Sequence, residues 1–255
     1  QAIRVEEDDV LLPGLPGHLS ELCLAGVPPQ LLFSVCHPWR RLLYSQFPAS
    51  FSLYVLLSTG ETPSIEFFTL DPLSSTWEAL PPPPSDPPLR LIHRHPAFIS
   101  RNLPIQALAV CNHLVLLAGT TQELFPSLSQ PLVFHPETGE WFFGPPFHAP
   151  RRWCAAGAIG NTVYLASGYG NKYCAKVARS MEQWRLTSKK KHWKWEALTG
   201  LSDGRFSREA VGGVGWRGKL YMVNMKGSGA KEGVVYDPQN DTWQVMPEGM
   251  VAGWN

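Results

Sequence analysis

Long apolar segments are missing from this 255-residue chain, and so is an excess of charge of one sign. No run of apolar residues approaches the roughly 20 that a membrane-spanning helix needs. Lysine and arginine number 22, aspartate and glutamate 21, and the net charge is +1. A chain with so balanced a charge has no general electrostatic attraction to nucleic acid or to a membrane surface. The sequence therefore predicts neither of these as a partner.

Cysteine is scarce, and its spacing is not that of a disulfide framework. The chain has five cysteines, an odd number, and several lie within apolar stretches. Such cysteines behave as small apolar side chains, which predicts a reduced protein of the cytoplasm or nucleus. Catalytic signatures are missing too, since no Gly-x-Ser-x-Gly, phosphate-binding loop or Cys-x-x-Cys pair occurs. The cysteines are Cys23, Cys36, Cys111, Cys154 and Cys174.

A phrase built on tryptophan occurs four times. Its tryptophans lie 64, 54 and 48 residues apart, and in three copies a proline stands five residues earlier. A period near fifty with one large aromatic residue per unit is typical of a β-propeller. Each blade is a small sheet that cannot bury both faces alone, so it must pack against its neighbours. The tryptophans are Trp77, Trp141, Trp195 and Trp243, and the prolines are Pro72, Pro136 and Pro238.

A second phrase recurs between the tryptophans. It reads as two apolar strands joined by a two-residue turn that contains asparagine or glycine. Both residue types tolerate the positive φ that tight hairpins need. The copies cover residues 110–119, 159–168 and, more loosely, 215–223. Their nearly continuous apolar runs are typical of strands sandwiched between neighbouring sheets, so we expect a mainly β fold.

In the order of their elements these units resemble kelch repeats. The resemblance implies a kelch-type β-propeller, and the alternative is an unrelated all-β sandwich with coincidental tryptophan spacing. The third unit lacks the proline, the fourth has Asn224-Met225 in place of a small residue and glycine, and the first has no recognisable hairpin. The resemblance covers residues 51–255 in about four units, at roughly 51–84, 105–146, 150–200 and 204–248.

Four units are fewer than a closed propeller contains. Residues 248–255 look like the opening strand of another unit. We therefore expect either that the chain is an incomplete part of a longer protein or that its propeller is open. Open blade edges carry unpaired strands, so such a chain should tend to associate.

The first fifty residues do not belong to the repeat. Residues 1–10 include an acidic stretch that we expect to be flexible, and residues 11–50 carry leucines at helical spacing. The pair Pro28-Pro29 separates two short helices, and Pro38 suits the first turn of a third. Three helices this small rarely sustain a core of their own. Either the propeller or a partner protein should therefore cover their leucines.

This helical segment resembles an F-box. It matches in the Leu-Pro pair that opens the first helix, the Val-Pro break and the final Val-Cys-x-x-Trp-Arg cluster. It departs at His18, where the family usually has an acidic residue. The resemblance implies that the segment docks on a Skp-type adaptor by packing its helices against a helical partner. The residues so implied are Leu15, Pro16, Leu19, Leu22, Val27, Pro28, Leu31, Leu32, Val35, Cys36, Trp39 and Arg40.

An F-box followed by kelch units looks like the plant F-box/kelch-repeat proteins of the Skp-interacting type. The resemblance implies the substrate-recognition subunit of an SCF-type (cullin–RING) E3 ubiquitin ligase, with an unidentified protein as substrate. Such a receptor is not an enzyme, because it only raises the effective concentration of a substrate lysine near the conjugating enzyme. The alternative is a kelch scaffold that acts without ubiquitination.

An enzyme built on the propeller is the remaining alternative. Some kelch-like propellers hold copper with tyrosine, cysteine and histidine ligands. In this chain those residue types form no compact cluster, because His93, His95, His113, His135 and His148 are scattered along it. We therefore expect no metal and no cofactor.

Residues that precede the first strands of the third and fourth units are the candidates for substrate binding. Loops at a propeller rim vary while the blades hold them rigid. In kelch relatives, arginines at this position often contact acidic or phosphorylated groups, which the planar guanidinium engages well. The alternative is that they cap strand ends or bridge blades. The candidates are Arg151, Arg152, Trp153, Tyr169, Arg205 and Arg208.

Overall fold

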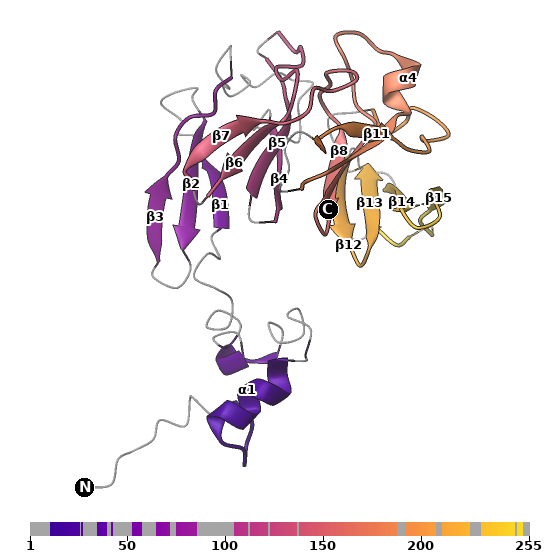
Figure 1. The fold of residues 1–255 in the computed structure, drawn as a ribbon. Coiled ribbons are helices and arrows are strands. Elements are labelled where there is room, and N and C mark those ends of the chain that lie inside the picture. The colour runs from indigo at the N-terminus through magenta and orange to yellow at the C-terminus, as the bar shows by residue number, and fades with distance from the viewer. Residues whose placement is uncertain are drawn as a thin grey trace, which may run out of the picture. The chain divides into compact units, whose positions relative to one another are not determined.

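The structure is a computed structural model of the chain, which divides into two compact units, Gln1–Leu53 with Thr69–Trp77 and Tyr54–Phe68 with Glu78–Asn255. Figure 1 follows the elements along the chain. The structure describes residues 11–25, 27, 35–39, 42, 53–57, 65–71, 75–85, 105–111, 113–121, 123–136, 138–187, 192–207, 211–224, 231–247 and 249–251.

Antiparallel sheets are the main secondary structure of the described chain (Figure 1). In each sheet the strands pair in sequence order, as a simple meander. The first sheet holds β1 (Leu53–Leu57), β2 (Glu66–Asp71) and β3 (Thr76–Ala79). The second holds β4 (Ile105–Val110), β5 (His113–Gly119), β6 (Leu132–His135) and β7 (Glu140–Phe143). The third holds β8 (Ala155–Ile159), β9 (Thr162–Ala166), β10 (Met181–Arg185) and β11 (Trp195–Ala197), and the fourth β12 (Val211–Trp216), β13 (Lys219–Asn224), β14 (Glu232–Asp237) and β15 (Thr242–Val245).

The hairpins that open the second, third and fourth sheets have the two-residue turns that the sequence predicts. Ile159 pairs with Thr162 across the turn of the third sheet, where Gly160 has a φ of +59°. In the fourth sheet the turn residues Arg217 and Gly218 both have positive φ. Glycine adopts this left-handed conformation without steric cost, which explains its place in the recurring phrase. Strand order along the chain is thus fixed largely by local turn chemistry.

The core lies between successive sheets. The central strands β5 and β9 are buried almost throughout, as their continuous apolar runs predict. One apolar cluster joins side chains of the first three sheets around Trp184 and Trp195, and a second joins the third and fourth sheets around Tyr164 and Tyr236. Strand β8 contacts both β4 and β12. The first strands of the second, third and fourth sheets therefore lie side by side.

Glycine allows the first strands to approach closely. A Cβ atom added at Gly157 of β8 would lie 2.7 Å from the amide nitrogen of Gly215 and 2.6 Å from Cδ1 of Leu220. Gly213 of β12 likewise faces the backbone of Ala156. Because backbone meets backbone here, any side chain would push the two sheets apart.

Three of the four recurring tryptophans join their sheet to the linker that leaves the sheet before it. In each case the indole N–H donates to a backbone carbonyl that lies four residues after the preceding tryptophan of the series. Because the acceptor is a main-chain group, the bond fixes the position of the linker without specifying its side chain. The contacts are Trp141 Nε1 to Pro81 O at 2.7 Å, Trp195 Nε1 to Pro145 O at 3.0 Å and Trp243 Nε1 to Thr199 O at 2.8 Å.

The N-terminal segment forms a small helical unit around helix α1 (Gly17–Ala25). Leu24 of this helix is buried together with Leu42, and four half-buried side chains pack against the pair. The indole N–H of Trp39 donates to the carbonyl of Leu11 at 2.6 Å, which ties the two ends of the segment together. The half-buried side chains are those of Leu11, Leu12, Val27 and Trp39.

Candidate functional site

Several large apolar side chains of the helical unit lie outside its core. Leu19 and Leu22 are spaced three residues apart on α1, so they share one face of the helix, and they are 40% and 71% exposed. Leu15 and Val35 are 42% and 56% exposed. A unit whose own core is so small thus leaves much of its apolar surface in solvent, which is typical of an interaction site.

The other residues that the F-box resemblance implies have different surroundings. Pro16 is exposed, and its carbonyl accepts the amide N–H of Ser20 in the first turn of α1 at 3.0 Å. Val27 and Trp39 pack against the small core, and Cys36 is half-buried. As adaptor contacts, all the residues that the resemblance implies stay predictions. Pro28, Leu31, Leu32 and Arg40 lie outside the described residues.

Among the candidate substrate residues, Arg151 is 1% exposed and fully engaged. Its Nη2 atom lies 2.5 Å from Oε1 of Glu182, itself buried. The remaining donors reach the carbonyls of Ala149 and Ser167 and the hydroxyl of Ser180. A buried charge needs this many partners to offset the loss of its hydration. Arg151 therefore holds together the linker before β8, the end of β9 and the start of β10.

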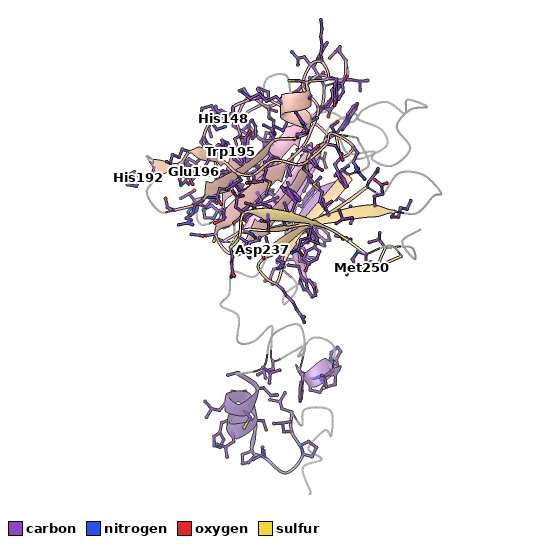
Figure 2. All side chains as sticks on the ribbon, turned by 90° about the vertical axis from the view of Figure 1, so that its right-hand side faces the viewer. His148, His192, Trp195, Glu196, Asp237 and Met250 are labelled. Carbon is purple, nitrogen blue, oxygen red and sulfur yellow. The ribbon has the colours of Figure 1, made fainter. Side chains whose placement is uncertain are left out.

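Glu182 has a second neighbour at the surface. Nδ1 of His148 lies 3.1 Å from Oε2 of this glutamate. His148, labelled in Figure 2, is exposed, so it covers the outer side of the buried ion pair. Both oxygens of Glu182 are thus occupied, one by Arg151 and one by His148.

Arg152, the next residue, has a very different environment. It is 6% exposed, yet its Nε and Nη1 atoms have no hydrogen-bond partner among the described residues. The guanidinium carbon lies 4.0 Å from the ring centroid of Trp153 and 5.1 Å from that of Tyr169. Burial lowers the pKa of this guanidinium from its ordinary value, and Tyr169 acts in the opposite direction. The charge is held by aromatic faces, which attract cations but accept no conventional hydrogen bond.

Aromatic side chains continue outward from Arg152. The rings of Trp153 and Tyr169 are 5.7 Å apart, and those of Tyr169 and Tyr173 are 6.1 Å apart. Tyr173 is exposed and lies two residues before the short helix α4 (Ala175–Ala178). Main-chain hydrogen bonds in both directions join Arg152 and Tyr169, so the linker before β8 and the loop after β9 are locked together. Tyr173 is not among the substrate-binding candidates that the sequence predicts, although it lies only four residues after Tyr169.

The backbone around this cluster is strained. Trp153 has a φ of +52° and Ser167 a φ of +59°. A bulky residue in the left-handed region costs free energy, and such residues gather at ligand-binding sites. The surroundings must therefore stabilise this conformation of Trp153, which aims its ring at the guanidinium.

Arg205, by contrast, is an exposed arginine whose charge is balanced. Its guanidinium lies 2.7 Å from Oδ2 of Asp203 and 3.4 Å from Oε2 of Glu232. The hydrogen bond from Arg205 holds the pKa of Asp203 below its usual range. These groups border a cavity of about 830 Å³ beside strand β15. Arg208 lies outside the described residues.

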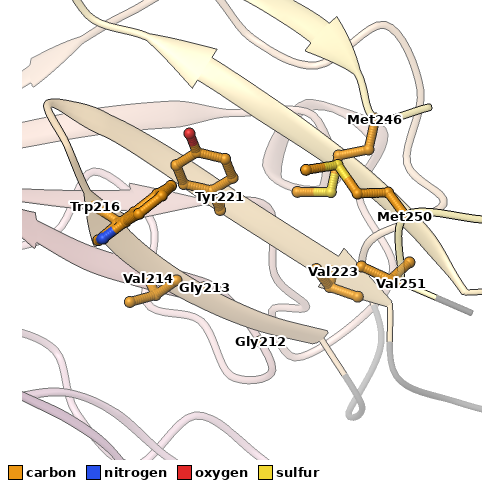
Figure 3. A pocket seen from close by; sticks show the side chains of 9 residues that line it. All are labelled: Gly212, Gly213, Val214, Trp216, Tyr221, Val223, Met246, Met250 and Val251. Carbon is orange, nitrogen blue, oxygen red and sulfur yellow. The ribbon is translucent and has the colours of Figure 1, made fainter. Parts of the chain in front are cut away.

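The fourth sheet carries an apolar hollow that sequence reasoning did not identify. In Figure 3 Trp216 and Tyr221 lie at one end of it and Met246, Met250 and Val251 at the other. The alternation of residues along β12 could have indicated this hollow. Because side chains alternate between the two faces of a strand, a strand that turns two glycines toward β8 presents its other residues to the opposite face. The hollow has a volume of about 490 Å³ and is lined by Gly212, Gly213, Val214, Trp216, Tyr221, Val223, Met246, Met250 and Val251.

Within the described ranges, no three histidine, cysteine, aspartate or glutamate side chains are grouped so that they could hold a metal ion. No helix in the described part of the chain has the length and apolar character needed to cross a membrane.

Comparison with known proteins gives a consistent picture. No protein-family model matches the chain. The chain is 48% identical, over 266 residues, to the F-box/kelch-repeat protein SKIP25 of Arabidopsis thaliana, with 100% of this chain and 67% of the relative covered. It is 25% identical to the F-box protein AFR of the same plant, with 96% of this chain and 64% of the relative covered. The chain thus spans about two thirds of the length of these relatives.

A solved structure, "Structure of YjhT", superimposes with a TM-score of 0.50 at 12% identity and covers 77% of this chain and 66% of that one. At this identity the similarity concerns the fold alone. Together with the four antiparallel sheets, it confirms the predicted mainly β, kelch-type propeller fold.

Proposed function

Because the chain belongs to the F-box/kelch-repeat family, we propose that it is the substrate-recognition subunit of an SCF-type cullin–RING ubiquitin ligase. The helical unit docks on a Skp-type adaptor, and the kelch sheets hold the protein that is to be ubiquitinated. The chain itself performs no bond chemistry. It contributes proximity, because tethering a substrate near the conjugating enzyme turns an encounter between two molecules into a nearly intramolecular step.

The exposed leucines of the helical unit carry this proposal. Leu19 and Leu22 lie on α1 but outside the core around Leu24 and Leu42. Apolar side chains on one face of an amphipathic helix are the anchors by which helices bind apolar grooves. This surface and its occurrence at the positions of the family motif support docking on a helical adaptor.

Adaptor binding by a double variant tests the proposal. We expect Leu19→Ala with Leu22→Ala to weaken binding of a purified Skp-type adaptor well over tenfold, since each leucine buried at an interface contributes about 1.5–3 kcal/mol. Both side chains are exposed in the free protein, so the melting temperature should change little. Calorimetric titration of adaptor into wild type and variant measures the effect.

Two exposed apolar residues, one at the end of β15 and one in the turn that follows it, provide the matched control. Val245→Ala with Met250→Ala removes a similar area of exposed apolar surface outside the helical unit, and adaptor affinity should be unchanged. Equal affinities for wild type and the leucine variant would reject docking through α1. The kelch alternative, an interaction protein that acts without ubiquitination, would then be preferred.

We place substrate binding on the cluster formed by Arg152, Trp153 and Tyr169. It lies where the linker before β8 and the loop after β9 meet, next to these two paired strands, and loops held by a sheet are a usual setting of a binding site. Arg151 supports this cluster from within through its pairing with Glu182. Arg205 has its own carboxylate partners and so carries less of the proposal.

A further inference from the structure

Strand β15, labelled in Figure 1, is the outer strand of the fourth sheet, and within the described residues it pairs with β14 alone. The amide of Met246 donates to the carbonyl of Gly233 on β14 at 2.9 Å. Hydrogen-bonded and non-hydrogen-bonded pairs alternate along an antiparallel ladder. The main-chain N–H and C=O groups of Val245 and Trp243 therefore point away from β14, toward the open edge.

β15 differs from the other outer strands because it carries no charged side chain. The outer strands β3, β7 and β11 each contain one glutamate, and the glutamate of β11 is paired with Lys194 at 3.0 Å. β15 reads Thr-Trp-Gln-Val, without proline and in regular register with β14. Charges, prolines and bulges are the features by which natural edge strands resist pairing with another strand. β15 has none of these features.

The cleft of about 830 Å³ lies beside this edge, and the linker between the third and fourth sheets forms its other wall. Val245 is 81% exposed and lies directly opposite Val234, which packs against the core shared by the two sheets. Directly opposite residues share one face of a sheet, and so does Glu232, two residues before Val234. A strand added to β15 would thus place the side chain opposite Val245 in the cleft.

One end of the cleft is polar and favours a basic group. The guanidinium of Arg205 lies 2.7 Å from Oδ2 of Asp203 and 3.4 Å from Oε2 of Glu232, so it joins the linker to β14. Lys231 and Asp241 also border the cleft. Three carboxylates against two basic side chains leave a net charge of −1. A positively charged side chain of a partner is therefore attracted to this end.

We propose that β15 is a peptide-docking edge, to which an extended segment of a partner protein adds as a fifth, antiparallel strand. The main chain of this segment bonds to Val245 and Trp243. A β-branched side chain opposite Val245 enters the cleft, and a basic side chain two residues earlier faces Glu232. In strand addition the main-chain bonds provide affinity, and the alternate side chains provide specificity. The site goes beyond the proposed function, because it uses neither the helical unit nor the Arg152 cluster.

A short synthetic peptide, acetyl-Lys-Thr-Val-Thr-Thr-Thr-amide, is the probe. Its valine is placed opposite Val245 and its lysine opposite Glu232 of the next strand, so it should bind the isotope-labelled chain. In two-dimensional NMR spectra we expect the largest shifts at the amides of Trp243 and Val245. Glutamate in place of the peptide's lysine should weaken binding about two- to fivefold, the effect of an exposed ion pair.

Two N-methylated peptides test the hydrogen bonds themselves. A methyl group on the valine nitrogen removes the N–H that bonds to the carbonyl of Val245, so binding should weaken at least about tenfold. A methyl group on the nitrogen of the next threonine is the matched control. That N–H points away from β15, because the direction alternates along a strand, and affinity should stay within about twofold of the parent peptide.

Val245→Pro tests the edge from the side of the protein. Proline removes an N–H that points away from β14, so the ladder and the melting temperature should be retained. Binding of the peptide should fall at least about tenfold. Ala197→Pro is the matched control on β11, where the amide of Leu198 donates to Met181 and that of Ala197 points outward. This variant should bind the peptide as wild type does.

The proposal is overturned if the parent peptide does not bind, if the two N-methylated peptides bind equally well, or if Val245→Pro binds the peptide as wild type does. The peptide pair decides the question even for a proline variant that fails to fold. A dimer that Val245→Pro abolishes, in a chain that does not bind the peptide, would assign the edge to a second copy instead. Adaptor binding is a separate measurement, and its loss would reject the ubiquitin-ligase role alone.

Discussion

The close approach of β8 and β12 leads to a quantitative prediction for Gly157→Ala. The added methyl group would lie 2.6 Å from Cδ1 of Leu220, 2.7 Å from the nitrogen of Gly215 and 3.0 Å from the carbonyl carbon of Val214. Favourable carbon contacts lie at about 3.5–4.0 Å. Because two of the three atoms belong to the β12 backbone, a rotation of the leucine cannot relieve the overlap, and the third and fourth sheets must separate by about 1 Å.

The cost follows from two opposing effects. Overpacking a well-packed core costs about 1–3 kcal/mol. Alanine also lowers the conformational entropy of the unfolded chain, which stabilises the native state by about 0.4–1 kcal/mol. We therefore expect Gly157→Ala to lower the free energy of unfolding by about 1–2 kcal/mol. For a domain of this size the melting temperature should fall by roughly 2–8 °C.

Urea denaturation, followed by far-ultraviolet circular dichroism, measures the effect. Gly170→Ala is the matched control, because the nearest atoms to its added Cβ would be 3.6 and 3.7 Å away, an ordinary contact. The control should lie within about 0.5 kcal/mol of wild type. If Gly157→Ala were as stable as Gly170→Ala, the close backbone packing between these sheets would be refuted.

Other contacts give shorter predictions. Trp195→Phe removes the indole N–H that donates to Pro145 O at 3.0 Å, so urea denaturation should show a loss of about 1–3 kcal/mol; an unchanged midpoint would contradict the joining role of the indole. The hydroxyl of Tyr236 holds the pKa of Asp241 below its usual range, so this carboxylate stabilises the native state above the ordinary carboxyl pKa of about 4, and the contribution is lost as the pH falls through the lower native pKa. Asp241→Asn should therefore flatten the fall in melting temperature between pH 5 and pH 2, and parallel profiles would refute this. Backbone N–H groups lower the pKa of the exposed Cys174 thiol, so iodoacetamide should alkylate it faster than the other exposed cysteines, as mass spectrometry would show; equal rates would contradict this.

The strand order could be predicted from the sequence because its signals are local. The turns at Gly160 and Gly218 need a positive φ, and the presence of glycine at these positions indicates it. The tryptophans recur because each sheet must be joined to the next, and Trp195 and Trp243 do this in the same way. None of these inferences requires knowledge of distant contacts.

The contrast between Arg151 and Arg152 could not be predicted from the sequence. Successive residues of an extended segment point to opposite sides, but the sequence does not tell which side meets a carboxylate. Here the answer depends on Glu182, which lies 31 residues after Arg151. The ion pair of Arg205 could be predicted from the sequence, because Asp203 lies only two residues before it.

The indole contacts between sheets have a consequence for how such a repeat can change. Each joint is specified on the donor side alone, since any residue supplies the carbonyl, and here the acceptor position holds proline twice and threonine once. Mutations in a linker therefore leave the joint intact as long as the backbone path is kept. Whole units could be duplicated, shuffled or replaced without matching changes in their neighbours, and a series of sheets can lose its sequence likeness long before it loses its geometry.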